Sequence, residues 1–107
     1  MATARVAARY AKALLSLAQE RNELDAVGQD LDTLDALFAG SRDLVVLLQS
    51  PIVKGDKKQA VLDAVRKGHV GELTASYLQI LIRKGREGLV VDMVQEGQTQ
   101  LRALRNI

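Results

Sequence analysis

Cysteine is absent from this chain of 107 residues, and histidine occurs only once. The lack of cysteine excludes disulfides, thiolate metal sites and cysteine nucleophiles. A single histidine cannot complete a closed zinc site of nitrogen and sulfur ligands. That histidine, His69, lies in the segment Gly-His-Val-Gly, where an exposed loop histidine is the ordinary interpretation. We therefore expect no metal site and no cofactor.

Aromatic residues and long apolar runs are also scarce. Aromatic side chains make up 3% of the chain, too few to provide a surface for base stacking. The longest apolar run, Leu44–Leu48, is far shorter than the ~20 residues that a membrane-spanning helix requires. The formal net charge is only +2, whereas nucleic-acid binders usually have a stronger basic footprint. These features argue against direct membrane insertion and against a nucleic-acid partner.

The titratable and nucleophilic residues do not form a recognisable catalytic pattern. Asp30, Asp32 and Asp35 fall mainly opposite the leucine seam of their segment, which predicts a solvated helix face rather than an acid–base pair. Ser16 and Ser76 have no base that the sequence places beside them. We therefore expect no catalytic residues, and we expect that the chain is not an enzyme.

Apolar residues follow the helical period throughout, and glycine, proline and capping residues divide the chain into six segments. The spacing predicts helices over 4–21, 23–40, 42–49, 56–68 and 72–84, and a sixth that contains 90–104. Gly40 is placed to end the second helix, Ser41 to cap the third, and Gly85 to occupy a left-handed turn after the fifth. The prediction is a single all-α domain, residues 1–107, folded as a compact bundle of five to six helices.

Two of the predicted helices have more apolar surface than one interface needs. In the first, the polar residues crowd into an arc of roughly 80°, and nearly all the rest of the circumference is apolar; these polar residues are Arg5, Arg9, Lys12, Ser16 and Gln19. In the fifth, Leu73, Tyr77, Ile80 and Leu81 form one stripe, which Leu78 and Ile82 widen. Either both helices are buried on two sides, or each offers one side to an amphipathic partner helix.

Three segments resemble one known family. Val6–Ala18, "VAARYAKALLSLA", resembles the first helix of the δ subunit of F-type ATP synthases, the relative of the mitochondrial oligomycin-sensitivity-conferring protein. Leu47–Leu62, "LLQSPIVKGDKKQAVL", is similar to that family's Ser-Pro connector and the lysine-bearing helix after it. Ser76–Gly97, "SYLQILIRKGREGLVVDMVQEG", looks like its fifth helix, Gly-Arg turn and sixth helix. The order and spacing of these segments extend the resemblance over essentially the whole chain.

The resemblance implies a six-helix N-terminal domain that binds the N-terminal helix of an α subunit in a groove between helices one and five. Carried over by motif position, the groove residues are Tyr10, Ala13, Leu14, Leu17, Tyr77, Ile80 and Leu81. The implied role is that of a non-catalytic stator component of the peripheral stalk, which holds the catalytic head against rotation. It also implies contacts with the b subunits through a C-terminal segment that this sequence does not contain. The absence of an obvious transit segment favours the cytoplasmic face of a bacterial membrane.

Gly97 departs from the family pattern, which often has phenylalanine at this place in the last helix. A glycine inside a helix lowers helical propensity by up to ~1 kcal/mol. It is also expected to leave core volume unfilled. The prediction for the packing of the sixth helix is affected, but the prediction for the groove is not.

Two other functions remain open from the residues alone. Lys54, Lys57 and Lys58, together with Arg83, Lys84 and Arg86, are two basic clusters that a small nucleic-acid-binding module could use. A homodimer could instead bury both surplus apolar faces against a second copy. Binding that depends steeply on salt would favour the first alternative, and the mass in solution would test the second.

Overall fold

A computed structural model of the chain describes residues 2–50, 63 and 70–105. The helices are α1 (Ala2–Glu20), α2 (Leu24–Gly40), α3 (Arg42–Gln49), α5 (Glu72–Arg83) and α6 (Val90–Arg105), with a short 3₁₀ helix, η1 (Glu87–Leu89), before α6. The described residues contain no strand, so the prediction of an all-α fold is confirmed. Apart from Asp63, the predicted fourth helix lies outside these ranges.

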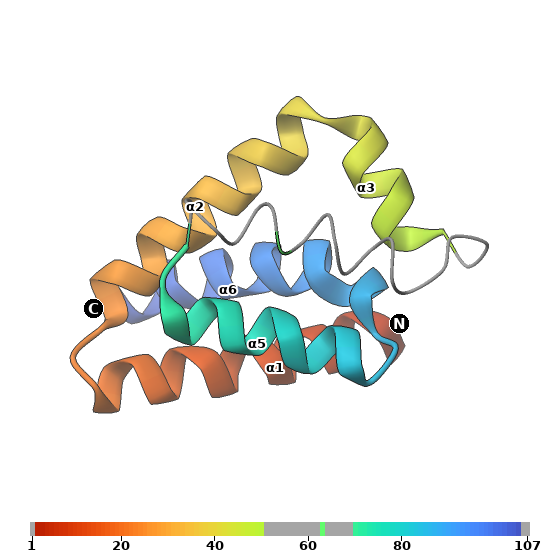
Figure 1. The fold of residues 1–107 in the computed structure, drawn as a ribbon. Helices are drawn as coiled ribbons and strands as arrows, with labels where there is room; N and C mark the ends of the chain where they lie inside the picture. Colours follow the sequence, from red (N-terminus) through yellow and green to blue (C-terminus); the bar gives the residue numbers. More distant parts are fainter. Residues whose placement is uncertain (1, 51–62, 64–69, 106–107) are drawn as a thin grey trace.

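The helices form a compact bundle in which α6 is central. In Figure 1, α1 and α5 lie side by side and run in opposite directions, with α6 behind them. The helices α2 and α3 form the upper part of the view. The most extensive packing is between α6 and α1, followed by α6 and α2. One side of the α1–α5 pair therefore rests on the rest of the bundle.

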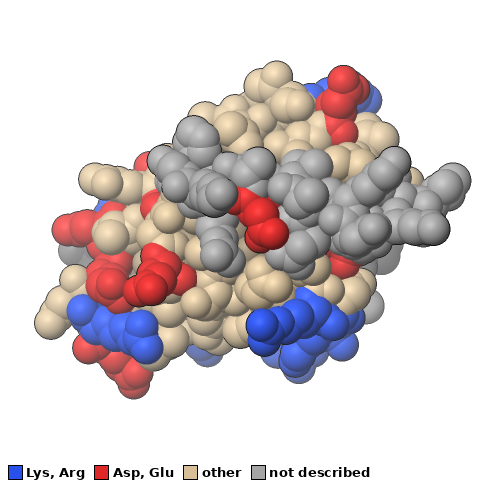
Figure 2. Space-filling view, viewed as in Figure 1, with Lys and Arg blue, Asp and Glu red and all other residues tan. Residues whose placement is uncertain are grey.

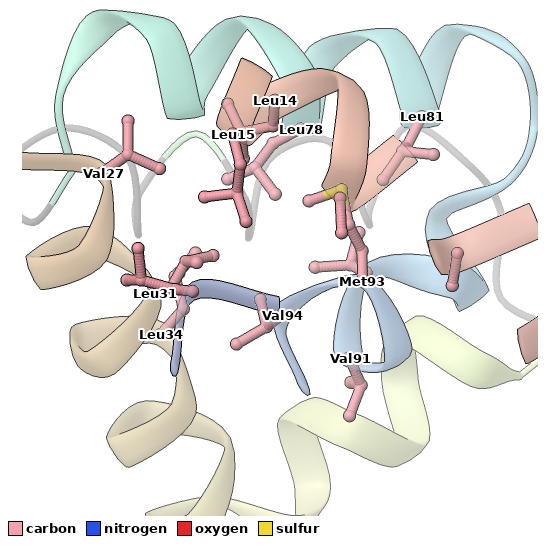
Figure 3. Close-up of a cluster of buried hydrophobic side chains, with 14 of the residues drawn as sticks. Leu14, Leu15, Val27, Leu31, Leu34, Leu78, Leu81, Val91, Met93 and Val94 are labelled. Atoms are coloured by element: carbon pink, nitrogen blue, oxygen red, sulfur yellow. The ribbon is translucent and has the colours of Figure 1, made fainter. Parts of the chain in front are cut away.

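The core is mainly aliphatic, with Phe38 and Met93 in addition, and every described α-helix contributes to it. Figure 3 shows leucine and valine side chains of α1, α2, α5 and α6 converging around Met93. The predicted seam of α2 is buried at Val27, Leu31, Leu34 and Phe38. In α6, Val90, Met93, Val94 and Leu101 are buried. Leu104, in the last turn of α6, is 38% exposed.

Specific residues end the helices where the sequence predicted. The hydroxyl of Ser41 accepts a hydrogen bond from the Leu44 backbone amide at 3.3 Å and caps α3. Gly85 has a φ of +67°, a left-handed conformation that glycine adopts without steric strain. The backbone amides of Gly85 and Arg86 then donate to the carbonyls of Ile82 and Leu81 at 2.9 and 2.7 Å. This pair of bonds is the Schellman arrangement that closes a helix C-terminus.

Gly97 has a different role from the one predicted. It is buried in α6 beside α1 and α2. A Cβ atom there would lie 2.9 Å from Cδ1 of Leu31 and 3.8 Å from Cβ of Ala11. The expectation of unfilled core volume at Gly97 is therefore wrong, because neighbouring side chains already occupy that space. The glycine allows α6 to pack closely against the two helices.

No helix within the described ranges combines the length and apolar character needed to cross a lipid bilayer.

Candidate functional site

The surplus apolar surface of α1 divides between the core and the molecular surface. Small and aliphatic residues face the bundle interior and are buried; they are Ala7, Ala11, Leu14, Leu15 and Ala18. Beside this buried stripe, Tyr10 and Leu17 are only half-buried, and Ala13 is exposed. Both interpretations of the surplus therefore hold in part: α1 is packed on more than one side, and some apolar residues still reach solvent.

Two residues of the predicted groove do not belong to the surface. Leu14 is 1% exposed and Leu81 is 0% exposed. Both side chains point into the cluster of Figure 3. The prediction that Leu14 and Leu81 line a binding groove is wrong for this conformation, because no part of either side chain is available to a partner. They lie four residues after Tyr10 and Tyr77, on the inner side of the same stripe.

The other five predicted residues remain at least partly accessible. In α5, Tyr77 is half-buried and Ile80 is 37% exposed, one of the larger exposures among the big apolar residues of the described chain. Tyr10, Ala13 and Leu17 share one stripe of α1 at spacings of three and four residues, and Tyr77 and Ile80 share one stripe of α5. Since the two helices are neighbours, we call these five residues the α1/α5 face.

A polar contact fixes one end of the α1/α5 face. The guanidinium of Arg86 donates a hydrogen bond to the Tyr10 hydroxyl at 3.1 Å. Nζ of Lys84 lies 5.9 Å from the centroid of the Tyr10 ring, within the range of a cation–π interaction. Lys84 is the C-cap residue of α5, and the left-handed turn at Gly85 that follows it leads to Arg86. Tyr10 is therefore held in position while part of its ring stays accessible.

Two hollows open beside these residues. One of about 410 Å³ is lined by Val6, Arg9, Tyr10, Ala13 and Arg86. A second of about 640 Å³ follows α5 and includes Ile80, with Ser76 and Arg83 among its other lining residues. Each hollow combines apolar carbon with polar side chains at its border. Such surfaces suit the apolar stripe of an amphipathic helix better than a small polar substrate.

The residues considered for chemistry are scattered. Ser76 donates to the carbonyl of Glu72 at 2.9 Å, and Asp32 accepts from Nε2 of Gln98 at 3.0 Å. Ser16 is exposed on α1. The described part of the chain contains no group of three or more histidine, cysteine or acidic residues able to hold a metal ion. His69 lies outside the described residues, as do Lys54, Lys57 and Lys58.

Asp30 corrects the expectation of a wholly solvated acidic face on α2. Its side chain is 9% exposed, and one carboxylate oxygen accepts hydrogen bonds from the Thr74 hydroxyl at 2.7 Å and the Gly71 amide at 3.0 Å. Both partners belong to the start of α5. Asp30 thus positions α5 relative to α2, and its partners are more than 40 residues away in the sequence, beyond the reach of any local pattern.

Sequence reasoning also missed the role of Lys84 and Arg86 in the α1/α5 face. It grouped them with Arg83 as a basic cluster, and all three are exposed. Their contacts with Tyr10 depend on the antiparallel arrangement of α1 and α5. The available signal was Gly85, because a left-handed residue after a helix turns the chain back along it.

Comparison with known proteins gives one consistent result. The model of the family described as ATP synthase delta (OSCP) subunit matches residues 6–107. The chain is 42% identical over 102 residues to an ATP synthase subunit delta of Cytophaga hutchinsonii, an alignment that covers 95% of this chain and 56% of the relative. It is 38% identical over 107 residues to the ATP synthase subunit delta of Pelodictyon phaeoclathratiforme, covering 100% of this chain and 60% of that protein.

A third relative, the ATP synthase subunit delta of Chlorobium phaeobacteroides, is 43% identical over 88 residues, which cover 82% of this chain and 49% of the relative. The chain thus spans about half to three-fifths of the length of these curated relatives.

Proposed function

The chain belongs to the ATP synthase delta (OSCP) subunit family, and from this premise we propose that it is a non-catalytic stator part of a proton-translocating F-type ATP synthase. In this proposal the α1/α5 face binds the amphipathic N-terminal helix of an α subunit and so holds the catalytic head against rotation. The chain would act at the periphery of the energy-transducing membrane, on the cytoplasmic face of a bacterial cell. Contacts with the b subunits would involve other parts of the full-length relatives.

One observation carries the proposal: apolar side chains remain accessible on two neighbouring helices whose opposite sides are packed into the core. Tyr10, Leu17 and Tyr77 are half-buried, while Ala13 and Ile80 are exposed. Removing such apolar surface from water contributes roughly 25 cal/mol per Å² to binding. Alanine at position 13 lets a partner helix approach closely, and the two tyrosines add large rings with polar tips.

A stator needs a firm contact but no chemistry, and the core beneath the α1/α5 face supports this role. Leu14 and Leu81 anchor the two helices from below. The Asp30 carboxylate fixes the start of α5, and the Arg86–Tyr10 hydrogen bond ties its end to α1. A surface that is held at both ends loses less conformational entropy when a partner binds.

The test is the binding of a synthetic peptide with the sequence of the N-terminal segment of the α subunit from the same organism, measured by titration calorimetry. Ile80→Asp should weaken binding more than tenfold, because a carboxylate would have to be desolvated against an apolar partner. Tyr10→Ala should weaken it about tenfold, as expected for truncation of an aromatic anchor. Both effects on the affinity should exceed the accompanying effects on the free energy of unfolding.

Val46→Asp is the matched control, because Val46 is 58% exposed on α3 and outside the α1/α5 face. It should leave peptide affinity unchanged. If all three variants bind the peptide as the wild type does, the assignment of this face is wrong.

A further inference from the structure

The two ends of the α1/α5 face carry charges of opposite sign. At the end where α1 begins and α5 finishes, Arg9, Arg83, Lys84 and Arg86 are exposed; we call this the basic end. At the other end, Glu20 and Glu72 are exposed and Glu23 is half-buried, with Arg21 as the basic residue among them; we call this the acidic end. Figure 2 shows blue atoms gathered at the right of this face, and red atoms beside a blue group at its left.

Helical spacing places these charges at the borders of the apolar stripe. Arg9 and Glu20 lie on the outer side of Tyr10 and Leu17 and are separated by eleven residues. On α5, Glu72 and Arg83 are also separated by eleven residues. Eleven residues of helix correspond to roughly 16 Å. Because α1 and α5 are antiparallel, as Figure 1 shows, this spacing places the two arginines toward one end of the pair and the two glutamates toward the other.

The positive charges of the basic end are not neutralised by carboxylates of the described residues. No carboxylate of the described residues forms an ion pair with Arg9, Arg83, Lys84 or Arg86. The hollow of about 410 Å³ at this end is lined by Arg9 and Arg86 together with Val6, Tyr10 and Ala13. That combination suits a partner helix that places an apolar side chain in the hollow and a carboxylate one helical turn away.

We propose that this charge pattern sets the direction in which the partner helix docks, with its N-terminus at the basic end and its axis parallel to α1. The inference rests on the proposed function, since it concerns the same face. Helices are stabilised by acidic residues in the first turn and basic residues in the last, because these charges complement the helix dipole. A partner of this type, with its acidic and basic turns about eleven residues apart, matches both ends of the face in one direction only.

The direct test uses two designed helical peptides with identical composition and the same apolar stripe. One has glutamates in its first turn and lysines in its last, and the other has the two exchanged. Each carries a nitroxide label at its N-terminus, and the broadening of protein amide signals is recorded by NMR. The first peptide should broaden the amides of Arg9 and Arg83, and the second those of Glu20 and Glu72.

A charge-exchanged protein is the matched control. The variant Arg9→Glu, Glu20→Lys, Glu72→Lys, Arg83→Glu retains the net charge and all five residues of the α1/α5 face. In this variant each labelled peptide should broaden the amide signals at the end opposite to the one it broadens in the wild type. A second measurement does not depend on the variant with four substitutions. The double variant Arg9→Gln, Arg83→Gln should lower the affinity for the first peptide about two- to tenfold at low salt, and by less at high salt. Arg42→Gln, at the start of α3, should have no such effect.

The outcomes separate the two proposals. Charge does not set the docking direction if both peptides broaden the amide signals of the same end, or of both ends equally. The same conclusion follows if the charge-exchanged protein gives the same pattern as the wild type. In each of these cases the proposed function stands. Failure of both designed peptides to bind, while the α-subunit peptide binds, also overturns the inference. If the α-subunit peptide does not bind either, both the inference and the proposed function are wrong.

Discussion

At the scale of single residues, Asp30 joins two helices that are distant in the sequence. Its carboxylate lies in the middle of α2 and accepts from the backbone amide of Gly71 and the hydroxyl of Thr74, both at the start of α5. Gly71 is the N-cap residue of α5 and has no side chain to satisfy the amides of the first turn. Asp30 therefore supplies from another helix an acceptor for the amide of the N-cap residue itself, the role that a Glu or Gln side chain at N3 has in a capping box.

Removing this carboxylate should destabilise the fold. Asp30→Ala is expected to lower the free energy of unfolding by about 1–3 kcal/mol, because the Thr74 hydroxyl, which is 0% exposed, loses its acceptor. Asp35→Ala, on the same helix but half-buried, should change stability by less than about 0.5 kcal/mol. Denaturant unfolding measures both. Equal effects of the two substitutions would show that the contact between Asp30 and Thr74 contributes nothing.

Residue-level predictions from the sequence succeed where the relevant interaction is local. Ser41 and Gly85 were placed correctly, because a cap and a left-handed turn involve only neighbouring residues. Leu14 was assigned to the wrong surface, because helical spacing gives the relative direction of side chains but not the position of the neighbouring helices. Asp30 was missed for the same reason. Periodicity cannot show which part of a polar face another element covers.

At the scale of helices, the crossing of α6 over α1 and α2 is set by small residues. Ala11 of α1 is 1% exposed, and Gly97 of α6 is buried in the same region. A Cβ atom on Gly97 would lie 2.9 Å from Cδ1 of Leu31, closer than carbon atoms normally approach. The larger residue expected from the family pattern at this position would need a different separation of the helices.

Gly97→Ala should therefore lower the free energy of unfolding by about 1 kcal/mol, although alanine is the better helix former. The added methyl group forces Leu31, which is fully buried, out of its position. In the Gly97→Ala variant, Leu31→Val should lower the free energy of unfolding by less than it does in the wild type, because the shorter side chain relieves the contact with the added methyl group. Thermal and denaturant unfolding of the two single variants and the double variant measure this coupling.

Gly40→Ala is the comparison for the effect of helical propensity alone. Gly40 is the last residue of α2, and a Cβ atom there would have nothing within 4 Å. This substitution should leave stability unchanged or raise it by up to about 1 kcal/mol. If Gly97→Ala stabilises the protein as much as Gly40→Ala does, the close packing at Gly97 is not a constraint.

At the scale of the whole molecule, the sequence predicted the number and order of the described helices better than their contacts. The all-α class and the ends of α2, α3 and α5 follow from periodicity and capping residues. Of the seven residues proposed for the groove, the five that form the α1/α5 face remain accessible. Leu14 and Leu81, which are buried, neighbour the accessible ones on the helix, and helical spacing alone does not show how deeply each helix is seated in the bundle.

The distribution of buried residues also predicts how the molecule opens. The central helix, α6, buries six residues, whereas α3 buries only Leu48 among its eight. Local stability follows the number of buried apolar contacts, so α3 should open without the rest of the bundle. Amide hydrogen exchange should give α6 an opening free energy equal to the global free energy of unfolding. That of α3 should be at least about 2 kcal/mol lower, so its amides should exchange at least ~30-fold faster than those of α6.

Gly97→Ala provides the internal control for this measurement. Because it weakens the packing of α6, it should increase the exchange rate of the α6 amides in proportion to its effect on global stability. The α3 amides exchange through a local opening that does not involve Gly97, so their rates should not change. If α3 and α6 show the same opening free energy in the wild type and respond equally to Gly97→Ala, the bundle unfolds as one unit. The α1/α5 face would then share its stability with every other part of the described chain.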